Sequence, residues 1–274
     1  MDKRVTSCLS GAICGDVIGS VYEFDPVKVK SFTLFSPLSE YTDDTVMTLA
    51  VAKALTEVNA HEDVEGFKTA LIRNMHELGK KYPDCGYGGR FERWLLTGDT
   101  KPYNSCGNGS AMRVSAVAWY AKSLEEAEAL AKASAEVTHN HPDGIAGAVA
   151  TAGAIYLARM GESKESIREY VSKFYNLDFT LDGLRPYYEF EPCCDGTVQP
   201  SVLAFLDSDS FEDAIRITIS MGGDADTMGA ITGAIAEAYY GIPDELEQTA
   251  LSHLDDYLLD IAEAFDEMLI KENG

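Results

Sequence analysis

The chain has 274 residues, of which 46% are hydrophobic, so it can bury a substantial core as one domain spanning residues 1–274. Lys and Arg number 22 against 45 Asp and Glu, which gives a formal net charge of −23. A surface this negative repels phosphate backbones, so we expect no generic nucleic-acid binding and no membrane partner. An acidic excess also keeps a protein soluble and identifies no partner by itself, and we expect a monomer.

Neither a membrane span nor an export signal is expected. No apolar run approaches the roughly 18 to 20 residues that a spanning helix needs, and no apolar stretch precedes Cys8. We therefore expect a cytoplasmic protein. The six cysteines, at positions 8, 14, 85, 106, 193 and 194, show no CxxC spacing, which predicts reduced thiols and an incidental Cys193-Cys194 pair.

Apolar and small residues recur at three- and four-residue spacing along nearly the whole chain, which predicts an all-α fold. No fixed-period repeat or Pro/Ser-rich linker divides the chain, so the pattern predicts a single unit. The expected helices cover residues 4–20, 44–58, 63–80, 89–96, 110–121, 124–136, 143–160, 164–174, 198–206, 211–221, 226–240 and 244–271.

Three of these helices carry stripes of small residues. Each internal glycine costs about 1 kcal/mol relative to alanine, so close approach of helix backbones must offset the cost. Such packing would give a rigid platform for groups at the helix ends. The stripes are formed by Gly11, Gly15 and Gly19, by Gly144, Ala148 and Ala152, and by Gly229, Ala230, Gly233, Ala234 and Ala236.

Two helices are expected to begin in clusters of oxygen-bearing side chains, Thr42-Asp43-Asp44-Thr45 and Asp224-Ala225-Asp226-Thr227. One Asp or Thr at a helix start is ordinary N-capping, worth about 1 kcal/mol. Four carboxylates in two such turns exceed that need, and their hard oxygens suit Mg²⁺ or Mn²⁺ better than zinc or copper. From these residues alone, a metal site and a pair of capping turns both remain open.

Five separated motifs resemble the ADP-ribosylglycohydrolase family, in the order that the family has them. They run from residue 11 to residue 230, so the resemblance covers most of the chain. The resemblance implies an all-α, compact orthogonal helical bundle with a dinuclear site for two Mg²⁺ or Mn²⁺ among the central helix ends. The motifs are Gly11-Ala12-Ile13-Cys14-Gly15-Asp16-Val17-Ile18-Gly19, Tyr41-Thr42-Asp43-Asp44-Thr45, Gly107-Asn108-Gly109-Ser110-Ala111-Met112-Arg113, Thr138-His139 and Ser220-Met221-Gly222-Gly223-Asp224-Ala225-Asp226-Thr227-Met228-Gly229-Ala230.

Position by position, the resemblance assigns site roles to this chain. Glu23 matches a glutamate near the metals, although a solvated charge after a helix is the ordinary alternative. Asp16 is expected to be structural, as a partner of the metal ligands. We expect the catalytic carboxylates to be Glu23, Asp43 and Asp44. The matched metal ligands are Thr42, Asp43, Asp44, Asp224, Asp226 and Thr227.

The chemistry expected of such a site is hydrolysis of the bond between ADP-ribose and an acceptor. Vicinal ribose hydroxyls on the metals would fix the sugar so that its C1 faces a nucleophilic water. Glycosidic cleavage also needs a proton for the leaving group and a base for the water, roles usually filled by two carboxyls. The sequence leaves open which carboxylate is the acid and which is the base.

A glycine-rich turn before a helix, Ser105-Cys106-Gly107-Asn108-Gly109-Ser110, lies where the family binds phosphate. We expect Ser105, Gly107, Asn108, Gly109 and His139 to bind substrate, although such turns are mostly only turns and His139 could belong to a polar loop. Relatives carry an aromatic residue at the position of Cys106 to stack on adenine. Tyr103 is the candidate substitute.

The glycine-rich loop Asp84–Arg90 is predicted either to cover the site as a lid or to connect two helices. The acceptor is not readable from any motif; ADP-ribosyl-arginine is favoured over serine and O-acetyl-ADP-ribose. A non-catalytic ADP-ribose-binding or structural relative would be expected to have lost metal ligands, and none is substituted. A prenyl-diphosphate enzyme would need a third carboxylate where Met47 stands.

Overall fold

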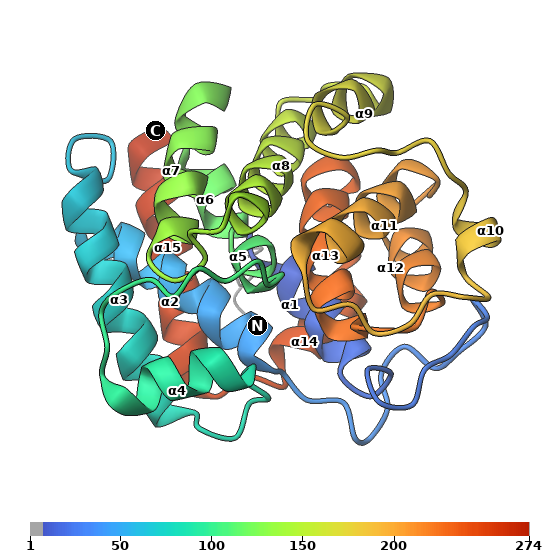
Figure 1. The fold of residues 1–274 in the computed structure, drawn as a ribbon, viewed down its shortest axis with the longest axis horizontal. Helices are drawn as coiled ribbons and strands as arrows, with labels where there is room; N and C mark the ends of the chain where they lie inside the picture. Colours follow the sequence, from blue (N-terminus) through green and yellow to red (C-terminus); the bar gives the residue numbers. More distant parts are fainter. Residues whose placement is uncertain (1–7, 274) are drawn as a thin grey trace.

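The computed structural model describes residues 8–273, which contain fifteen helices and no β-strand (Figure 1). The prediction of an all-α fold is confirmed. No helix among the described residues is both long and apolar enough to cross a membrane. The first eight helices are α1 (Ser10–Gly19), α2 (Asp43–Glu57), α3 (Val64–Lys81), α4 (Gly89–Thr97), α5 (Gly109–Met112), α6 (Ser115–Tyr120), α7 (Leu124–Glu136) and α8 (Pro142–Arg159). The others are α9 (Lys164–Val171), α10 (Leu181–Leu184), α11 (Cys194–Leu206), α12 (Phe211–Ile219), α13 (Ala225–Tyr240), α14 (Asp244–Leu251) and α15 (Asp256–Asn273).

Most predicted helices are found within a few residues of their expected limits, but two are split. The expected helix over 110–121 is interrupted between α5 and α6. The expected helix over 244–271 is interrupted after Leu251, because the Asp255 carboxylate accepts the N–H of Leu258 at 2.9 Å and begins a new helix. The expected start at residue 4 lies outside the described residues.

Two further helix limits differ from prediction. α11 begins at Cys194 rather than residue 198, so that Pro200 lies in its interior rather than in its first turn. α10 was not predicted at all; this single turn is capped by the Thr180 hydroxyl, which accepts the N–H of Gly183 at 3.2 Å. Such a short helix has too few residues to show a periodic pattern.

The small-residue stripes of α1 and α13 face one another near the middle of the molecule (Figure 1). A Cβ added to Gly15 would lie 1.9 Å from the carbonyl oxygen of Gly229, and one added to Gly233 would lie 2.1 Å from that of Gly11. The two backbones therefore touch, which confirms the close packing predicted from the glycines. Every residue of α1 is buried.

The close contact of α1 and α13 positions the two acidic turns. Gly19 ends α1 with its Cα against the backbone of Ala225 and Asp226, where α13 begins. α2 begins beside the same point, since Thr42 and Thr45 bond to Asp16 of α1. The C-terminal end of α1 thus meets the N-terminal ends of α2 and α13, where helix dipoles favour anionic groups.

Candidate metal centre and substrate pocket

The two acidic turns are in direct contact. The Thr227 hydroxyl donates to Asp44 Oδ2 at 3.2 Å, and the Asn108 amide donates to Asp224 Oδ2 at 2.6 Å. Within the second turn, Asp226 Oδ1 accepts the N–H of Thr227 at 2.9 Å. Residues more than one hundred positions apart therefore form one cluster of oxygens.

Asp16 organises the first turn from behind. Its fully buried carboxylate accepts hydrogen bonds from both the N–H and the hydroxyl of Thr42, at 3.0 and 2.7 Å, and from the N–H of Thr45 at 3.0 Å. The Thr45 hydroxyl donates a fourth bond. The expectation that Asp16 is a structural partner agrees with this geometry. Thr42 also accepts the N–H of Asp44, so it acts as the N-cap of α2.

The cluster has an excess of negative charge. Burial, together with repulsion from neighbouring carboxylates, raises the pKa of Asp43, Asp44 and Asp226 well above the usual range. Among residues 8–273, none of the ion pairs includes these three, Asp224 or Glu23. Without a cation such a group is neutralised by protonation, and a bound cation would let the carboxylates keep their charge.

The donor set fits a hard divalent cation. Asp44 Oδ1 is buried and has no hydrogen-bond partner. Burying a carboxylate oxygen without a partner is unfavourable, and a bound cation would supply one. One oxygen from each of Glu23, Asp224 and Asp226 lies within 4.8 Å of the others. Carboxylate and hydroxyl oxygens are the ligands that Mg²⁺ and Mn²⁺ prefer.

Glu23 lies in the loop that follows α1, and its carboxyl group lies beside those of Asp224 and Asp226. Burial and the neighbouring Asp226 raise its pKa to about 8, so without a cation it keeps its proton at neutral pH. Its side chain lines the main cavity and also a second hollow that contains Phe24 and Phe190. Glu23 therefore lies between the acidic cluster and this adjoining hollow.

A cavity of about 280 Å³ lies over the acidic cluster. It contains every sequence-predicted site residue except Thr42, whose hydroxyl is turned toward Asp16. The cavity is lined by Glu23, Asp43, Asp44, Met47, Gly86, Gly88, Gly89, Arg90, Phe91, Tyr103, Ser105, Gly107, Asn108, Gly109, Met112, Arg113, His139, Phe190, Pro192, Asp224, Asp226 and Thr227.

The predicted phosphate turn forms one wall of this cavity, but two of its N–H groups already have acceptors. Gly107 donates to the Ser105 hydroxyl at 3.1 Å, and Asn108 donates to the carbonyl of Pro192 at 2.9 Å. Gly109 and Ser110 begin α5, and the first N–H groups of a helix have no carbonyl within it to bond. Of these two residues only Gly109 lines the cavity, because Ser110 is fully buried, so the turn can offer the N–H of Gly109 rather than all of its amides.

The ring of His139 lies against the same turn. Arg113 donates to the Thr138 hydroxyl at 2.9 Å, which leaves that hydroxyl's hydrogen free to donate to His139 Nδ1 at 2.7 Å. The proton of the neutral ring is then on Nε2, which lies about 3.3 Å from where a Cβ on Gly107 would stand. Burial, with Arg113 and Arg90 nearby, holds the pKa of His139 well below its usual range.

The glycine-rich loop Asp84–Arg90 borders the cavity, as the lid prediction requires. The carbonyl of Cys85 accepts the N–H of Asp43 at 2.7 Å, which ties the loop to the acidic cluster. Gly86, at φ +87°, and the exposed Gly88 follow it along the cavity. Arg90 lies over the Tyr103 ring at 5.0 Å, donates to the carbonyl of the same residue and lines the cavity.

Several cavity residues were not predicted. Met47 follows Asp43 by four positions on α2, so helical spacing could have indicated it. Arg113 belongs to the Gly107–Arg113 motif, but only the fold shows that it donates a hydrogen bond to Thr138. Phe190 and Pro192 precede α11 in an irregular segment, and no local pattern indicated them.

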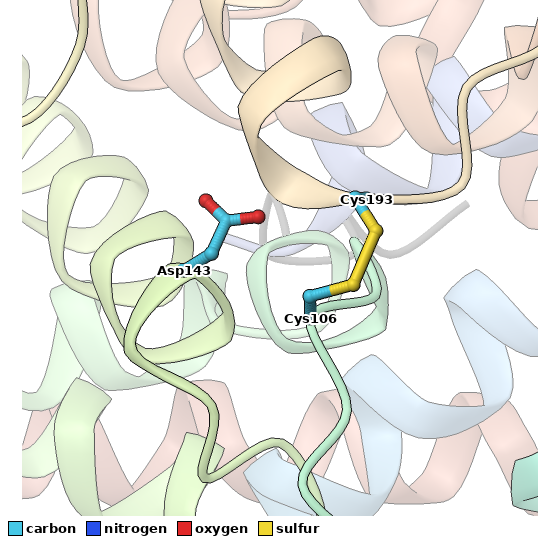
Figure 2. A group of neighbouring side chains, drawn as sticks. All are labelled: Cys106, Asp143 and Cys193. Atoms are coloured by element: carbon cyan, nitrogen blue, oxygen red, sulfur yellow. A yellow bond between two sulfur atoms is a disulfide. The ribbon is translucent and has the colours of Figure 1, made fainter.

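The expectation of six reduced thiols is wrong for one pair. Cys106 and Cys193 form a disulfide across 87 residues, with Cα atoms 5.2 Å apart (Figure 2). The adjacent cysteine, Cys194, is buried and free. Sequence spacing cannot show such a pairing, because the two segments meet only in the fold.

The fold and the site define an all-α protein with a carboxylate-lined pocket at the starts of two central helices. A family model described as ADP-ribosylglycohydrolase matches residues 1–273. Human ADP-ribosylhydrolase ARH3 is 26% identical over 327 aligned positions, which cover 90% of this chain and 89% of that protein. ADP-ribosyl-[dinitrogen reductase] glycohydrolase of Rhodospirillum rubrum is 30% identical over 227 positions, covering 79% and 74%.

A solved structure of an ADP-ribosylglycohydrolase-related protein complex superposes with a TM-score of 0.69 at 26% identity, covering 96% of both chains. The chain therefore belongs to the ADP-ribosylglycohydrolase family, as its motifs indicated. It is classed with enzymes that hydrolyse glycosidic bonds.

Proposed function

We propose that this protein releases ADP-ribose from a conjugate by divalent-cation-dependent hydrolysis of the bond at ribose C1. The observation that carries the proposal is the unpaired carboxylate cluster at one end of a cavity whose other end offers N–H donors. Human ARH3 and the Tri1 ADP-ribosylarginine hydrolase of Pseudomonas putida, 26% identical over 97% of this chain, are named for such reactions.

The proposed cation ligands are those that the two acidic turns bring together. Asp43 and Asp44 come from the start of α2, and Asp224, Asp226 and Thr227 come from the start of α13. Two Mg²⁺ or Mn²⁺ ions bound there would orient vicinal ribose hydroxyls and make a nearby water more acidic. Thr42 would act through its hydroxyl oxygen, which Asp16 fixes in place.

The opposite end of the cavity suits a diphosphate. The N–H group of Gly109 and the Nε2–H of His139 are the donors there, and a neutral histidine donates without competing for a proton. Arg90 adds a positive charge at the rim. The distance between this end and the carboxylates is filled by one continuous cavity, so a single ligand can reach both.

Proton transfer is assigned to the carboxyls that border the reacting bond. Glu23 lines both the main cavity and the adjoining hollow, so it lies between ribose and acceptor and can transfer a proton to or from the leaving group. Asp43 and Asp44 lie deeper and are the candidates to hold the attacking water.

Arginine is the favoured acceptor. The adjoining hollow is lined by Glu189 and Glu23, by the aromatic side chains of Phe24 and Phe190, and by Lys28, whose ammonium donates to the carbonyls of Tyr188 and Met221. Carboxylates and aromatic faces both attract a guanidinium group. Serine and the acetyl ester of ADP-ribose, which lack this charge, are the second candidates.

The test is release of ADP-ribose from arginine- and serine-linked ADP-ribosyl peptides with Mg²⁺, with Mn²⁺ and with a chelator. We expect release from the arginine peptide that stops with chelator and falls at least about 100-fold in Asp226→Asn. Asp178→Asn removes an exposed carboxylate that does not line the cavity and should retain full activity. Binding of ADP-ribose without any release would instead identify a non-catalytic relative.

A further inference from the structure

The Cys106–Cys193 pair joins two segments that together form a wall of the cavity. Cys106 lies in the turn before α5, and Cys193 immediately precedes α11. Their Cα separation of 5.2 Å lies within the range that a disulfide spans without backbone movement. Figure 2 shows the sulfur atoms between these two segments, with Asp143 of α8 beside them.

The flanking backbone is paired as closely as the sulfurs. Asn108 donates to the carbonyl of Pro192 at 2.9 Å, and Cys194 donates to the carbonyl of Cys106 at 3.0 Å. Ser105, Gly107 and Pro192, which stand next to the two cysteines, all line the cavity. The crosslink therefore holds residues that would contact the substrate.

The same wall extends to the acidic cluster through one side chain. The Asn108 amide donates to Asp224 Oδ2 at 2.6 Å and to the Thr197 hydroxyl of α11 at 3.2 Å. The backbone of Asn108 is thus bonded to the segment that carries Cys193, and its side chain is bonded to both α11 and the acidic cluster. A change in the spacing of Cys106 and Cys193 would be transmitted to Asp224.

Among the described cysteines, only these two are close enough to bond with one another, and both are partly exposed. Cys14 and Cys194 are fully buried, which keeps them from reagents in solution. The Asp143 carboxylate lies within 4.8 Å of both sulfurs and accepts bonds from the Tyr175 hydroxyl and the Asp195 N–H.

We propose that Cys106 and Cys193 form a reversible thiol–disulfide site that controls ADP-ribose binding by fixing the cavity wall. This inference rests on the proposed function. The oxidant is a small-molecule disulfide: one cysteine thiolate attacks it, giving a mixed disulfide and one released thiol. The second cysteine then displaces the second thiol. The two cysteine protons leave on the two released thiols, and the protein gains one disulfide.

The test compares full-length protein treated with oxidised glutathione and with a reducing phosphine. Peptide mass spectrometry after alkylation reports the crosslink, and calorimetry with Mg²⁺ and free ADP-ribose reports affinity. We expect the oxidised form to contain a Cys106–Cys193 peptide and to bind ADP-ribose about fivefold or more tightly, because a fixed wall costs less to order. In Cys193→Ser the difference should vanish, while Cys8→Ser, a partly exposed cysteine outside the cavity, should keep it.

Other results overturn the inference in distinguishable ways. If the crosslinked peptide is absent, or if both forms bind ADP-ribose with equal affinity, then the cysteine pair does not control ADP-ribose binding. Stoichiometric zinc in the reduced protein that is lost in Cys193→Ser and prevents oxidation would make the pair, with Asp143, a metal site instead. Should Cys193→Ser not fold, Cys106→Ala replaces it.

A failure of the proposed function has its own signature. If neither form binds ADP-ribose, hydrogen exchange of the Asn108 amide still tests the crosslink. Slower exchange in the oxidised form would support the thiol–disulfide site and reject ADP-ribose as its ligand, whereas unchanged exchange would reject both.

Discussion

Asp44 accepts a hydrogen bond from the Thr227 hydroxyl at 3.2 Å across 183 residues of sequence. This contact joins the first turns of α2 and α13, whose dipoles both favour negative charge. One oxygen of Asp44 is satisfied by this bond, and the other is buried without a partner. The relationship makes Asp44 the most direct probe of cation binding.

Asp44→Asn should abolish the stabilisation that cations give. A cation at one hundred times its dissociation constant stabilises the folded protein by about 2.7 kcal/mol, so Mn²⁺ should raise the melting temperature of the unmodified protein. The variant should show no such rise, and its metal-free form should not be less stable, because one of several repelling carboxylates is gone. Thermal denaturation with and without Mn²⁺ measures both effects. A full Mn²⁺ shift in Asp44→Asn would remove this residue from the ligand set.

Asp16→Asn should lower both stability and cation affinity without altering any proposed ligand. Asp16 accepts four hydrogen bonds from Thr42 and Thr45, and an amide cannot accept all of them. We expect a loss of about 1 to 3 kcal/mol in the free energy of unfolding. Cation affinity should fall about 10- to 100-fold, as is usual when a partner of the ligands is lost. Calorimetric Mn²⁺ titration that gave unchanged affinity would restrict Asp16 to stability alone.

Gly15→Ala should destabilise the protein severely. The added Cβ would lie 1.9 Å from the carbonyl oxygen of Gly229, and neither backbone can move without separating α1 from α13. The expected loss is about 3 kcal/mol or more, measured by urea denaturation. Gly89→Ala is the matched control, since its Cβ would meet nothing within 4 Å; it should change stability by no more than about 1 kcal/mol. Equal stabilities of the two variants would contradict the close contact.

His139 should make stability fall at mildly acidic pH. Burial holds its pKa well below the usual range, so below about pH 6.5 the unfolded chain binds a proton that the folded protein does not. The contribution is therefore complete above pH 6.5 and is lost as pH falls toward the folded-state pKa, by about 1.4 kcal/mol per pH unit. His139→Asn cannot titrate and should show a shallower dependence. Urea denaturation of both proteins at pH 7.5, 6.5 and 5.5 gives the free energy of unfolding as a function of pH. If the two proteins show the same pH dependence, His139 is not held neutral in the folded state.

Much of the fold and part of the site could be predicted from local sequence. Helical spacing located most helices, and the side chains of Thr42, Asp63 and Ser123 cap α2, α3 and α7 as such residues do at helix starts. The glycines of α1 also indicated close packing before any partner was known. These features depend on residues three or four positions apart, so the sequence alone determines them.

Only the tertiary structure decided which of these residues meet. It bonded the Thr42 hydroxyl to Asp16, left Thr42 outside the cavity lining, and brought Phe190 and Pro192 to the cavity wall. It also paired Cys106 with Cys193, where the sequence predicted free thiols. Such contacts join segments from 26 to 183 residues apart, and their formation depends on how the helices pack rather than on any local pattern.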